Sequence, residues 1–248
     1  MSAYALYVLA ALGKRSHSGS EAAAKYVVFG GAASAVSLYG LSLIYGSTGT
    51  TYLAVIAAAP SATLVSPMFM VGLFLLLAGL FFKLAVFPFH AWAPDVYVGA
   101  PTPVTAFLAV ASKAAGFVAL LQLVYVGFYA RPEVFEPLVW ILAAVSMTVG
   151  NLIALRQTNL VRLMAYSGVA QTGFIIAPLA VAGHDRAIGD QALSAVLTYL
   201  AVYAAMNLGA FAVIITLARR SGSAEIESFS GAFHYAPAMT VAMTIFFG

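Results

Sequence analysis

The sequence predicts an all-α membrane protein, a polytopic transmembrane bundle with about six full spans and a half-span at each end. Of its 248 residues, 63% are hydrophobic and only 8% are charged, whereas a soluble domain has about 25% charged residues. Apolar runs of roughly 20 residues alternate with short polar joints, as in helices that cross a bilayer. Alternating ten-residue segments typical of a transmembrane β-barrel are absent. We expect a single transmembrane domain over residues 1–248.

The composition also disfavours several kinds of site. The chain has no cysteine, which excludes disulfides, thiolate metal sites and iron–sulfur clusters. The formal net charge of +3 is small, and no basic block with interleaved aromatic residues indicates nucleic acid. The four histidines lie mostly in joints, and dinucleotide, Walker and zinc-protease motifs are absent. We therefore expect no cofactor, metal or redox centre in this chain.

Both ends hold an apolar run too short for a bilayer of about 30 Å. The runs are Tyr4–Leu12, which a basic pair follows, and Pro237–Gly248. We expect the chain to be an internal piece of a longer protein, cut inside a helix at each end. The alternative is an interfacial N-terminal helix and a frayed C-terminus.

Six runs between these ends are long enough to span. They are predicted at Glu21–Tyr45, Ser66–Phe87, Val104–Tyr129, Val134–Leu155, Asn159–Ala182 and Gln191–Leu217. Ser20 is the predicted N-cap of the first, and the Pro101-Thr102-Pro103 sequence marks the start of the third. Small residues such as the Gly30–Ala35 run predict close helix packing in lipid.

The placement of lysine and arginine predicts the orientation of the bundle. Alternate joints carry the basic residues and should face the cytoplasm, or the matrix or stroma: Lys14, Arg15, Arg156 with nearby Arg162, Arg219 and Arg220. The opposite joints hold only Arg131 and Arg186. The Pro88–Pro103 turn falls on the basic side.

Two consecutive spans each carry a lysine, which membrane helices seldom tolerate. Lys113 lies about ten residues inside its helix, or about 15 Å from its start, where insertion costs about 2.5–3.5 kcal/mol. We favour a functional role; a lysine that only holds helices together is the alternative. Lys83 is close enough to Pro88 for its side chain to reach the interface. The proline break favours function, because it frees a backbone carbonyl that polar groups or water must satisfy.

Other polar residues surround this break. Burial favours the neutral amine of a lysine and a nearby carboxylate favours the ammonium, so a lysine under both influences can gain and lose a proton. His90 follows Pro88 and suits a proton relay. The alternative places it in an interfacial aromatic belt with Trp92 and Tyr97. Asp95 is expected to cap or turn the connection.

Three further groups of polar residues have two interpretations each. Glu21 and Lys25 form an i, i+4 pair, which at a helix start is usually an ordinary stabilising pair. Polar stripes in the fifth and sixth spans fit either helix packing or the lining of a hydrated channel. They comprise Arg162, Tyr166 and Gln171, and Tyr199, Tyr203 and Asn207.

These motifs together resemble the N subunit of proton-translocating NADH:quinone oxidoreductase, respiratory complex I, and its photosynthetic counterpart. The central resemblance runs from Lys83 to Gly116: a lysine, then Pro-Phe-His, Trp, Pro-Asp-Val-Tyr, Gly-Ala-Pro-Thr-Pro-Val and Ala-Ser-Lys. Further stretches match in order, at Glu21–Tyr26, Leu38–Gly40, Arg162–Ser167 and Met206–Phe211. The resemblance covers nearly the whole chain.

The resemblance implies an antiporter-like membrane-arm subunit that moves protons. Lys83 matches the family's lysine on a broken helix, Lys113 its central lysine, and His90 the histidine between them. Glu21 and Lys25 match an acid–base pair near the cytoplasmic side.

The resemblance also implies partners and a location. NADH, FMN, iron–sulfur clusters and quinone are expected in partner subunits, and neighbouring membrane-arm subunits and lipid are the expected contacts. The expected location is a bacterial cytoplasmic (inner) membrane, with no nucleic-acid partner.

Three departures from the family pattern qualify this expectation. The glutamate that pairs with the first lysine should lie just before Met1, and a second broken-helix lysine should lie beyond Gly248. Gln171 stands where many relatives have histidine. Two alternatives stay open: a subunit of a cation/proton antiporter or membrane-bound hydrogenase, and a structural assembly subunit with vestigial lysines.

Overall fold

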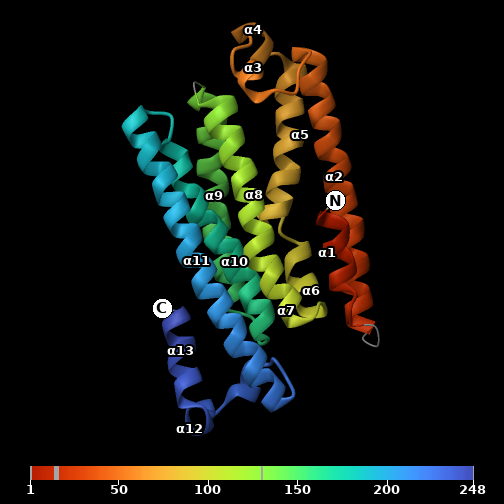
Figure 1. The fold of residues 1–248 in the computed structure, drawn as a ribbon, viewed down its shortest axis with the longest axis vertical. Helices are drawn as coiled ribbons and strands as arrows, with labels where there is room; N and C mark the ends of the chain where they lie inside the picture. Colours follow the sequence, from red (N-terminus) through yellow and green to blue (C-terminus); the bar gives the residue numbers. More distant parts are fainter. Residues whose placement is uncertain (1, 14–16, 130, 248) are drawn as a thin grey trace.

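The computed structural model describes residues 2–13, 17–129 and 131–247. Helices form almost all of this part of the chain, and its only strand-like pairing is an isolated bridge between Asn159 and Glu225. The long helices run side by side in an elongated bundle (Figure 1). The predicted all-α architecture is confirmed.

Six helical stretches within the described ranges are long and apolar enough to cross a membrane, which confirms the predicted spans. Four are single α-helices: α2 (His17–Thr48), α5 (Pro67–Leu84), α9 (Pro132–Ala154) and α11 (Arg186–Ser221). The fifth joins α10 (Leu160–Ile176) to the 3₁₀ turn η3 (Ala177–Val181). The third contains α7 (Thr102–Phe107), the π-helical η1 (Leu108–Ser112), α8 (Lys113–Gln122) and the π-helical η2 (Leu123–Phe128).

Short helices occupy the ends and the joints. The apolar end runs form α1 (Ser2–Ala10) and α13 (Pro237–Phe247). The sequence did not predict the joint helices α3 (Leu53–Ala57), α4 (Ser61–Leu64), α6 (Trp92–Gly99), η4 (Ile226–Phe229) and α12 (Ala232–Tyr235).

Local chemistry explains several helix ends. The Asn159 side chain accepts hydrogen bonds from the first N–H groups of α10, as an N-cap does. The prediction of Ser20 as an N-cap is wrong, because α2 begins earlier, at His17. The added turn packs the backbone of Ser18 against Gly99 of α6, a tertiary contact that local sequence does not reveal.

The second span ends earlier than predicted. Its last helical residue is Leu84, because Ala85 adopts a left-handed backbone conformation with φ of 56°. Figure 1 shows α5 stopping about halfway along the bundle, with α6 continuing toward the other end. The predicted break near Pro88 is therefore confirmed, and it lies inside the bundle.

Side chains from elsewhere satisfy backbone groups that the break releases. The Trp92 indole N–H donates to Phe82 O at 2.8 Å. Ser146 Oγ accepts a hydrogen bond from Phe87 N at 3.1 Å. These bonds matter because an unsatisfied backbone group costs several kcal/mol in lipid.

Small residues allow the helices to approach closely, as the sequence predicted. On α2 and α5, a Cβ atom added at Gly40 would lie 2.6 Å from Leu76 N, and one at Gly72 would lie 2.8 Å from Gly40 O. Side chains larger than hydrogen would push these two backbones apart. Close approach of this kind is a main source of helix association in lipid.

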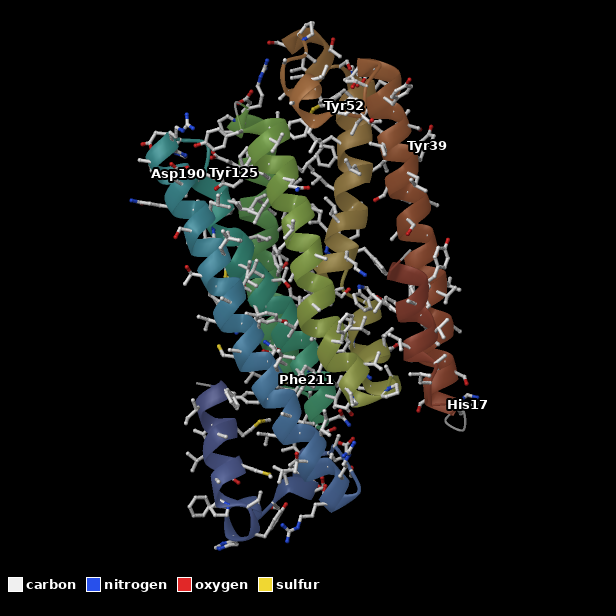
Figure 2. The ribbon with its side chains drawn as sticks, viewed as in Figure 1. His17, Tyr39, Tyr52, Tyr125, Asp190 and Phe211 are labelled. Atoms are coloured by element: carbon white, nitrogen blue, oxygen red, sulfur yellow. The ribbon has the colours of Figure 1, made fainter. Side chains whose placement is uncertain are left out.

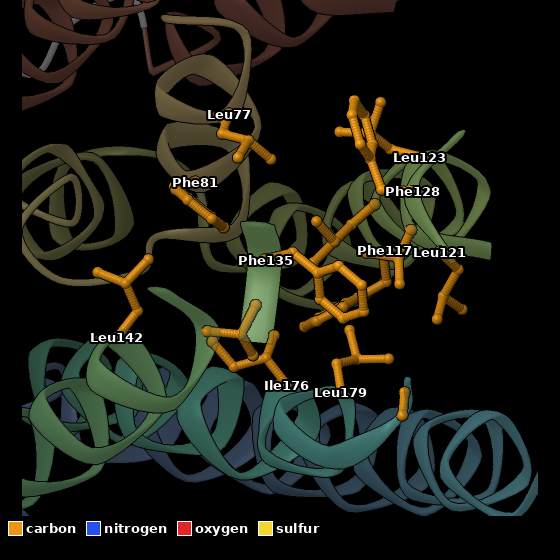
Figure 3. Close-up of a cluster of buried hydrophobic side chains, with 14 of the residues drawn as sticks. Leu77, Phe81, Phe117, Leu121, Leu123, Phe128, Phe135, Leu142, Ile176 and Leu179 are labelled. Atoms are coloured by element: carbon orange, nitrogen blue, oxygen red, sulfur yellow. The ribbon is translucent and has the colours of Figure 1, made fainter. Parts of the chain in front are cut away.

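The buried side chains form two clusters. One contains Phe117, Phe135 and Leu179, drawn in Figure 3. The other contains Trp92, Tyr97 and Phe211, and Figure 2 labels Phe211 on α11. Trp92 and Tyr97 are only 3% and 1% exposed, so their assignment to an interfacial aromatic belt is wrong.

The two ends of the bundle carry different joints. Figure 2 places His17 at one end, and Tyr125 and Asp190 toward the other. Lys14 and Arg15, on which part of the orientation prediction depends, lie outside the described residues. Which end faces the cytoplasm stays a prediction.

Candidate functional site

Lys113 is the most deeply buried ionisable cation of the site, with 1% of its surface exposed. Its Nζ donates to Gly168 O at 2.7 Å and lies 3.2 Å from Thr172 Oγ1. Both partners belong to α10. Among the described residues, no carboxylate lies within ion-pair distance of this ammonium. Neutral oxygens alone therefore hold the charged form of Lys113.

Thr172 connects Lys113 to the end of the broken helix. Its hydroxyl lies 3.1 Å from Leu84 O and 2.8 Å from Gly168 O. The hydroxyl can donate to either carbonyl while it accepts a hydrogen bond from Lys113. Thr172 thus contacts both the broken end of α5 and the buried ammonium, so a movement of that helix end can reach Lys113 through this one residue.

Tyr203 on α11 closes another side of the site. Lys113 Nζ lies 6.0 Å from the centre of the Tyr203 ring, at the outer limit of a cation–π contact. The Tyr203 hydroxyl donates to Ala109 O at 3.2 Å. Ala109 belongs to η1. The backbone N–H of Lys113 would bond Ala109 O in a regular α-helix, but here it donates to Val110 O. π-Helical turns are rare and frequently mark functional sites.

Gly168 gives these groups room to meet. A Cβ atom at this position would lie 3.0 Å from Lys113 Nζ and 3.4 Å from the Tyr203 hydroxyl. Any larger residue would therefore press directly on the ammonium.

Lys83 lies in the last turn of α5, next to the break. It is half-buried, and within the described ranges its ammonium has no hydrogen-bond or ion-pair partner. A Cβ atom at Gly116, one turn beyond Lys113, would lie 3.4 Å from Lys83 Cγ. Lys83 and Lys113 therefore lie on adjoining helices, and the aliphatic part of Lys83 packs about one helical turn from Lys113.

His90 lies in the turn between α5 and α6. Its Nδ1 is buried and has no hydrogen-bond partner among the described residues. The imidazole packs 5.3 Å from the Phe87 ring and edge-on to Tyr166 at 6.2 Å, between ring centres. Burial lowers the pKa of His90 below its ordinary value. A buried polar atom without a partner costs about 1–3 kcal/mol, so this nitrogen is a natural position for water.

A charged cluster joins α2, α6 and α10. Lys25 Nζ lies 2.8 Å from Glu21 Oε1 and 2.8 Å from Asp95 Oδ2. Arg162 lies 3.5 Å from the second oxygen of Asp95. All four residues line a cavity of about 150 Å³. Asp95 was expected only to cap or turn the connection, and instead it bridges two cations from distant helices.

Gln171 and Tyr166 occupy different places. Gln171 Oε1 accepts a hydrogen bond from the Tyr199 hydroxyl at 2.6 Å. With Asn207 it lines a cavity of about 40 Å³ between α10, α11 and α13. The Tyr166 ring instead faces His90. Their role in lining a channel stays a prediction.

Sequence reasoning missed Thr172, Ser146 and the bridging role of Asp95. The available signal for Thr172 was its position four residues after Gly168 on an otherwise apolar face. No group of three or more His, Asp or Glu residues that could hold a metal is found in the described ranges.

Comparison with known proteins places the chain in a family. The transmembrane family described as NADH:quinone oxidoreductase/Mrp antiporter matches residues 1–248. The NADH-quinone oxidoreductase subunit N of Trichlorobacter lovleyi is 43% identical over 244 residues, which cover 97% of this chain and 49% of that protein. The chain thus spans about half the length of the curated relatives it matches.

Solved structures show the same architecture. Respiratory complex I from Thermus thermophilus with bound aureothin matches with a TM-score of 0.75 and 38% identity, over 97% of this chain and 51% of that chain. The membrane-bound sulfane sulfur reductase, an archaeal respiratory membrane complex, matches with a TM-score of 0.81 and 31% identity, over 98% and 49%.

Proposed function

The chain belongs to the NADH:quinone oxidoreductase/Mrp antiporter transmembrane family, and we propose that it is part of a proton-translocating membrane-arm subunit of NADH:quinone oxidoreductase, respiratory complex I. Six helical stretches among the described residues are long and apolar enough to cross a membrane, and the matching family is a transmembrane one. The chain is therefore a multi-pass membrane protein. A bacterial inner membrane is its location under the proposal, which the transmembrane family and the bacterial N-subunit relatives support.

The single observation that carries the proposal is the Lys113 site. Lys113 is 1% exposed and is held by Gly168 O and Thr172 Oγ1, and no carboxylate of the described residues pairs with it. The ammonium can donate to both oxygens, and the neutral amine avoids an unpaired buried charge. Such a group can store one proton inside the membrane and release it when its surroundings change.

We propose that Lys83 controls this exchange. No described residue pairs with its ammonium, and its stem packs beside Gly116, so its charge would act on Lys113 by repulsion. In the longer protein a glutamate would pair with Lys83, and movement of Lys83 toward it would favour the protonated form of Lys113. Water at the unpartnered Nδ1 of His90 would complete the connection.

Under the proposal, the energy for proton translocation comes from electron transfer in other subunits. NADH, FMN, iron–sulfur clusters and quinone would bind to other subunits. For the iron–sulfur clusters this agrees with a sequence that has no cysteine ligand. Neighbouring membrane-arm subunits would pass the conformational or electrostatic signal to Lys83.

The test replaces Lys113 with alanine in the full-length subunit within its membrane complex. We expect NADH-driven proton uptake by inverted membrane vesicles to fall at least tenfold while the complex still assembles. Arg156→Ala, which removes an exposed cation, is the control and should leave uptake unchanged. Wild-type uptake by an assembled Lys113→Ala complex would remove Lys113 from the mechanism.

Two alternatives are distinguished by related measurements. A structural assembly role predicts normal pumping in the Lys83→Ala/Lys113→Ala double variant, with loss of the complex only on deletion of the subunit. The high TM-score of the sulfane sulfur reductase match favours a related respiratory complex as the second candidate. In that case NADH would fail to drive proton uptake, and a different electron donor would succeed.

A further inference from the structure

The side chain of Trp92 holds the last turn of α5, which is the turn that carries Lys83. Its indole N–H donates to Phe82 O at 2.8 Å, and Phe82 directly precedes Lys83 in the chain. The same carbonyl accepts the backbone N–H of Ala85 at 3.1 Å. Both lone pairs of this carbonyl are therefore in use, one for the cap of the helix and one for the tryptophan.

The backbone at this helix end adopts a conformation that is unfavourable for alanine. Ala85 has φ of 56°, and Val86 N donates to Phe81 O at 3.0 Å. Together with the bond from Ala85 N, this is the pattern of a Schellman cap, in which glycine commonly takes this position. A Cβ atom disfavours the left-handed conformation, so the cap depends on contacts from outside α5. The hydrogen bond from Trp92 is one such contact.

The indole ring is itself fixed by its neighbours. Trp92 is only 3% exposed. Its ring stacks on Tyr26 of α2, with 4.8 Å between ring centres and 12° between the ring planes. It also packs against the Phe82 ring at 5.3 Å and meets Tyr97 edge-on at 6.2 Å, both measured between ring centres. These contacts keep the N–H of the ring directed at Phe82 O.

The two helices that hold the indole also carry the charged cluster. Tyr26 directly follows Lys25 on α2, and Trp92 lies three residues before Asp95 on α6. Lys25 and Asp95 form an ion pair at 2.8 Å, which joins α2 to α6. The indole is therefore attached to two helices that are bonded to each other, and it holds the end of a third helix, α5.

The position of this helix end determines where Lys83 lies. A Cβ atom at Gly116, one turn beyond Lys113, would lie 3.4 Å from Lys83 Cγ, so the last turn of α5 packs directly on the span that carries Lys113. The interaction between two charges depends on their separation. A displacement of the last turn of α5 would therefore change how strongly Lys83 acts on Lys113.

We infer that Trp92 is a positioning residue, which fixes Lys83 relative to Lys113 through its hydrogen bond to Phe82 O. The inference rests on the proposed function and adds to it a residue that acts through the backbone of α5 and exchanges no proton itself. It requires the indole N–H in particular, whereas a role in packing would require only the ring.

The test replaces Trp92 with 3-benzothienylalanine in the full-length subunit within its membrane complex. This residue has sulfur in place of the indole N–H, so it keeps the ring and removes the donor. We expect protons taken up per NADH oxidised to fall at least twofold in the assembled complex. The pH at which uptake is half-maximal should differ from wild type by about half a unit. The same replacement at Trp140, which is 64% exposed on α9, is the control and should match wild type.

A second experiment tests whether the hydrogen bond acts on the helix end. Glycine adopts the left-handed conformation of Ala85 without the steric cost, so Ala85→Gly supports the same cap by another route. Added to Trp92→Phe, it should restore at least half of the lost proton uptake. Ala192→Gly, at a buried alanine inside α11, is the matched control and should restore none.

Two results would overturn the inference. One is a wild-type proton ratio and pH profile in the complex that contains 3-benzothienylalanine at Trp92, and this decides the question even if Trp92→Phe does not assemble. The other is a loss in Trp92→Phe that Ala85→Gly leaves unchanged, which would assign the loss to the packing of the ring. Lys113→Ala separates the two levels. Normal pumping in Lys113→Ala rejects the proposed function, whereas loss there with normal pumping in the 3-benzothienylalanine complex rejects only the role of Trp92.

Discussion

Lys113 and Lys25 are two lysines of the same bundle that have opposite surroundings. The Lys25 side chain is 38% exposed and contacts two carboxylates at 2.8 Å. Lys113 is 1% exposed, and its hydrogen-bond partners among the described residues are a carbonyl and a hydroxyl. Carboxylates favour the charged form of Lys25, whereas no carboxylate of the described residues does so for Lys113. Under the proposed function, this difference is what allows Lys113, and not Lys25, to exchange a proton.

The strongest way to break this comparison is Gly168→Ala. The added methyl group would press on Lys113 Nζ and displace it from Gly168 O without removing any polar group. We expect proton uptake to fall about tenfold, equivalent to about 1.4 kcal/mol in the barrier. Gly31→Ala, where nothing lies within 4 Å of the added atom, is the matched control. Equal pumping by both variants would show that the Lys113 position is not critical.

Thr172→Val tests whether the hydroxyl that joins Lys113 to the broken helix is needed. The isosteric change leaves Leu84 O without the Thr172 hydroxyl and leaves the ammonium with Gly168 O alone, a destabilisation of about 1–3 kcal/mol. We expect pumping to fall severalfold and the thermal midpoint of the complex to fall. Thr216→Val removes an exposed hydroxyl that bonds within its own helix and should change neither. A silent Thr172→Val would mean that Gly168 O alone holds Lys113.

Asp95→Asn acts on the charged cluster and should have a smaller effect. It removes the carboxylate shared by Lys25 and Arg162, but solvent and salt already screen these partly exposed pairs. We expect pumping to fall by no more than about twofold, with the difference from wild type shrinking as salt rises. Glu21→Gln, which removes one partner of Lys25, should change less. A loss as large as that of Gly168→Ala would contradict the comparison.

The smallest expected effect is a pH dependence of stability at His90. Because burial lowers the pKa of His90 below 6.5, the unfolded chain binds a proton below this pH that the folded chain does not. The contribution is fully present above pH 6.5 and is lost as the pH falls toward the folded pKa. The thermal midpoint should therefore fall more between about pH 7.5 and 5.5 in wild type than in His90→Gln. His17→Gln, at an exposed position of α2, should behave like wild type.

The sequence predicted the spans because membrane crossing requires long apolar runs, a local property. It also predicted the burial of Lys113, because depth inside a helix follows from counting residues. It could not predict that α5 ends at Leu84, since nothing in the sequence signals a left-handed Ala85.

The partners of the site were the least predictable part. Thr172 reads as an ordinary small residue until α10 is placed beside Lys113. Asp95 binds Lys25, which lies 70 positions away in the chain. Such pairs depend on how helices pack, and the spacing of residues within one helix carries no record of them.

The π-helical turn η1, immediately before Lys113, has a mechanical consequence. A π turn holds more residues than an α turn, so η1 sets the angle between the helix before it and the helix after it. Deleting one residue from η1 would turn Lys113 by about 100° and shift it by about 1.5 Å relative to the start of the span. This turn therefore decides which face of the third span presents Lys113 to Gly168 and Thr172.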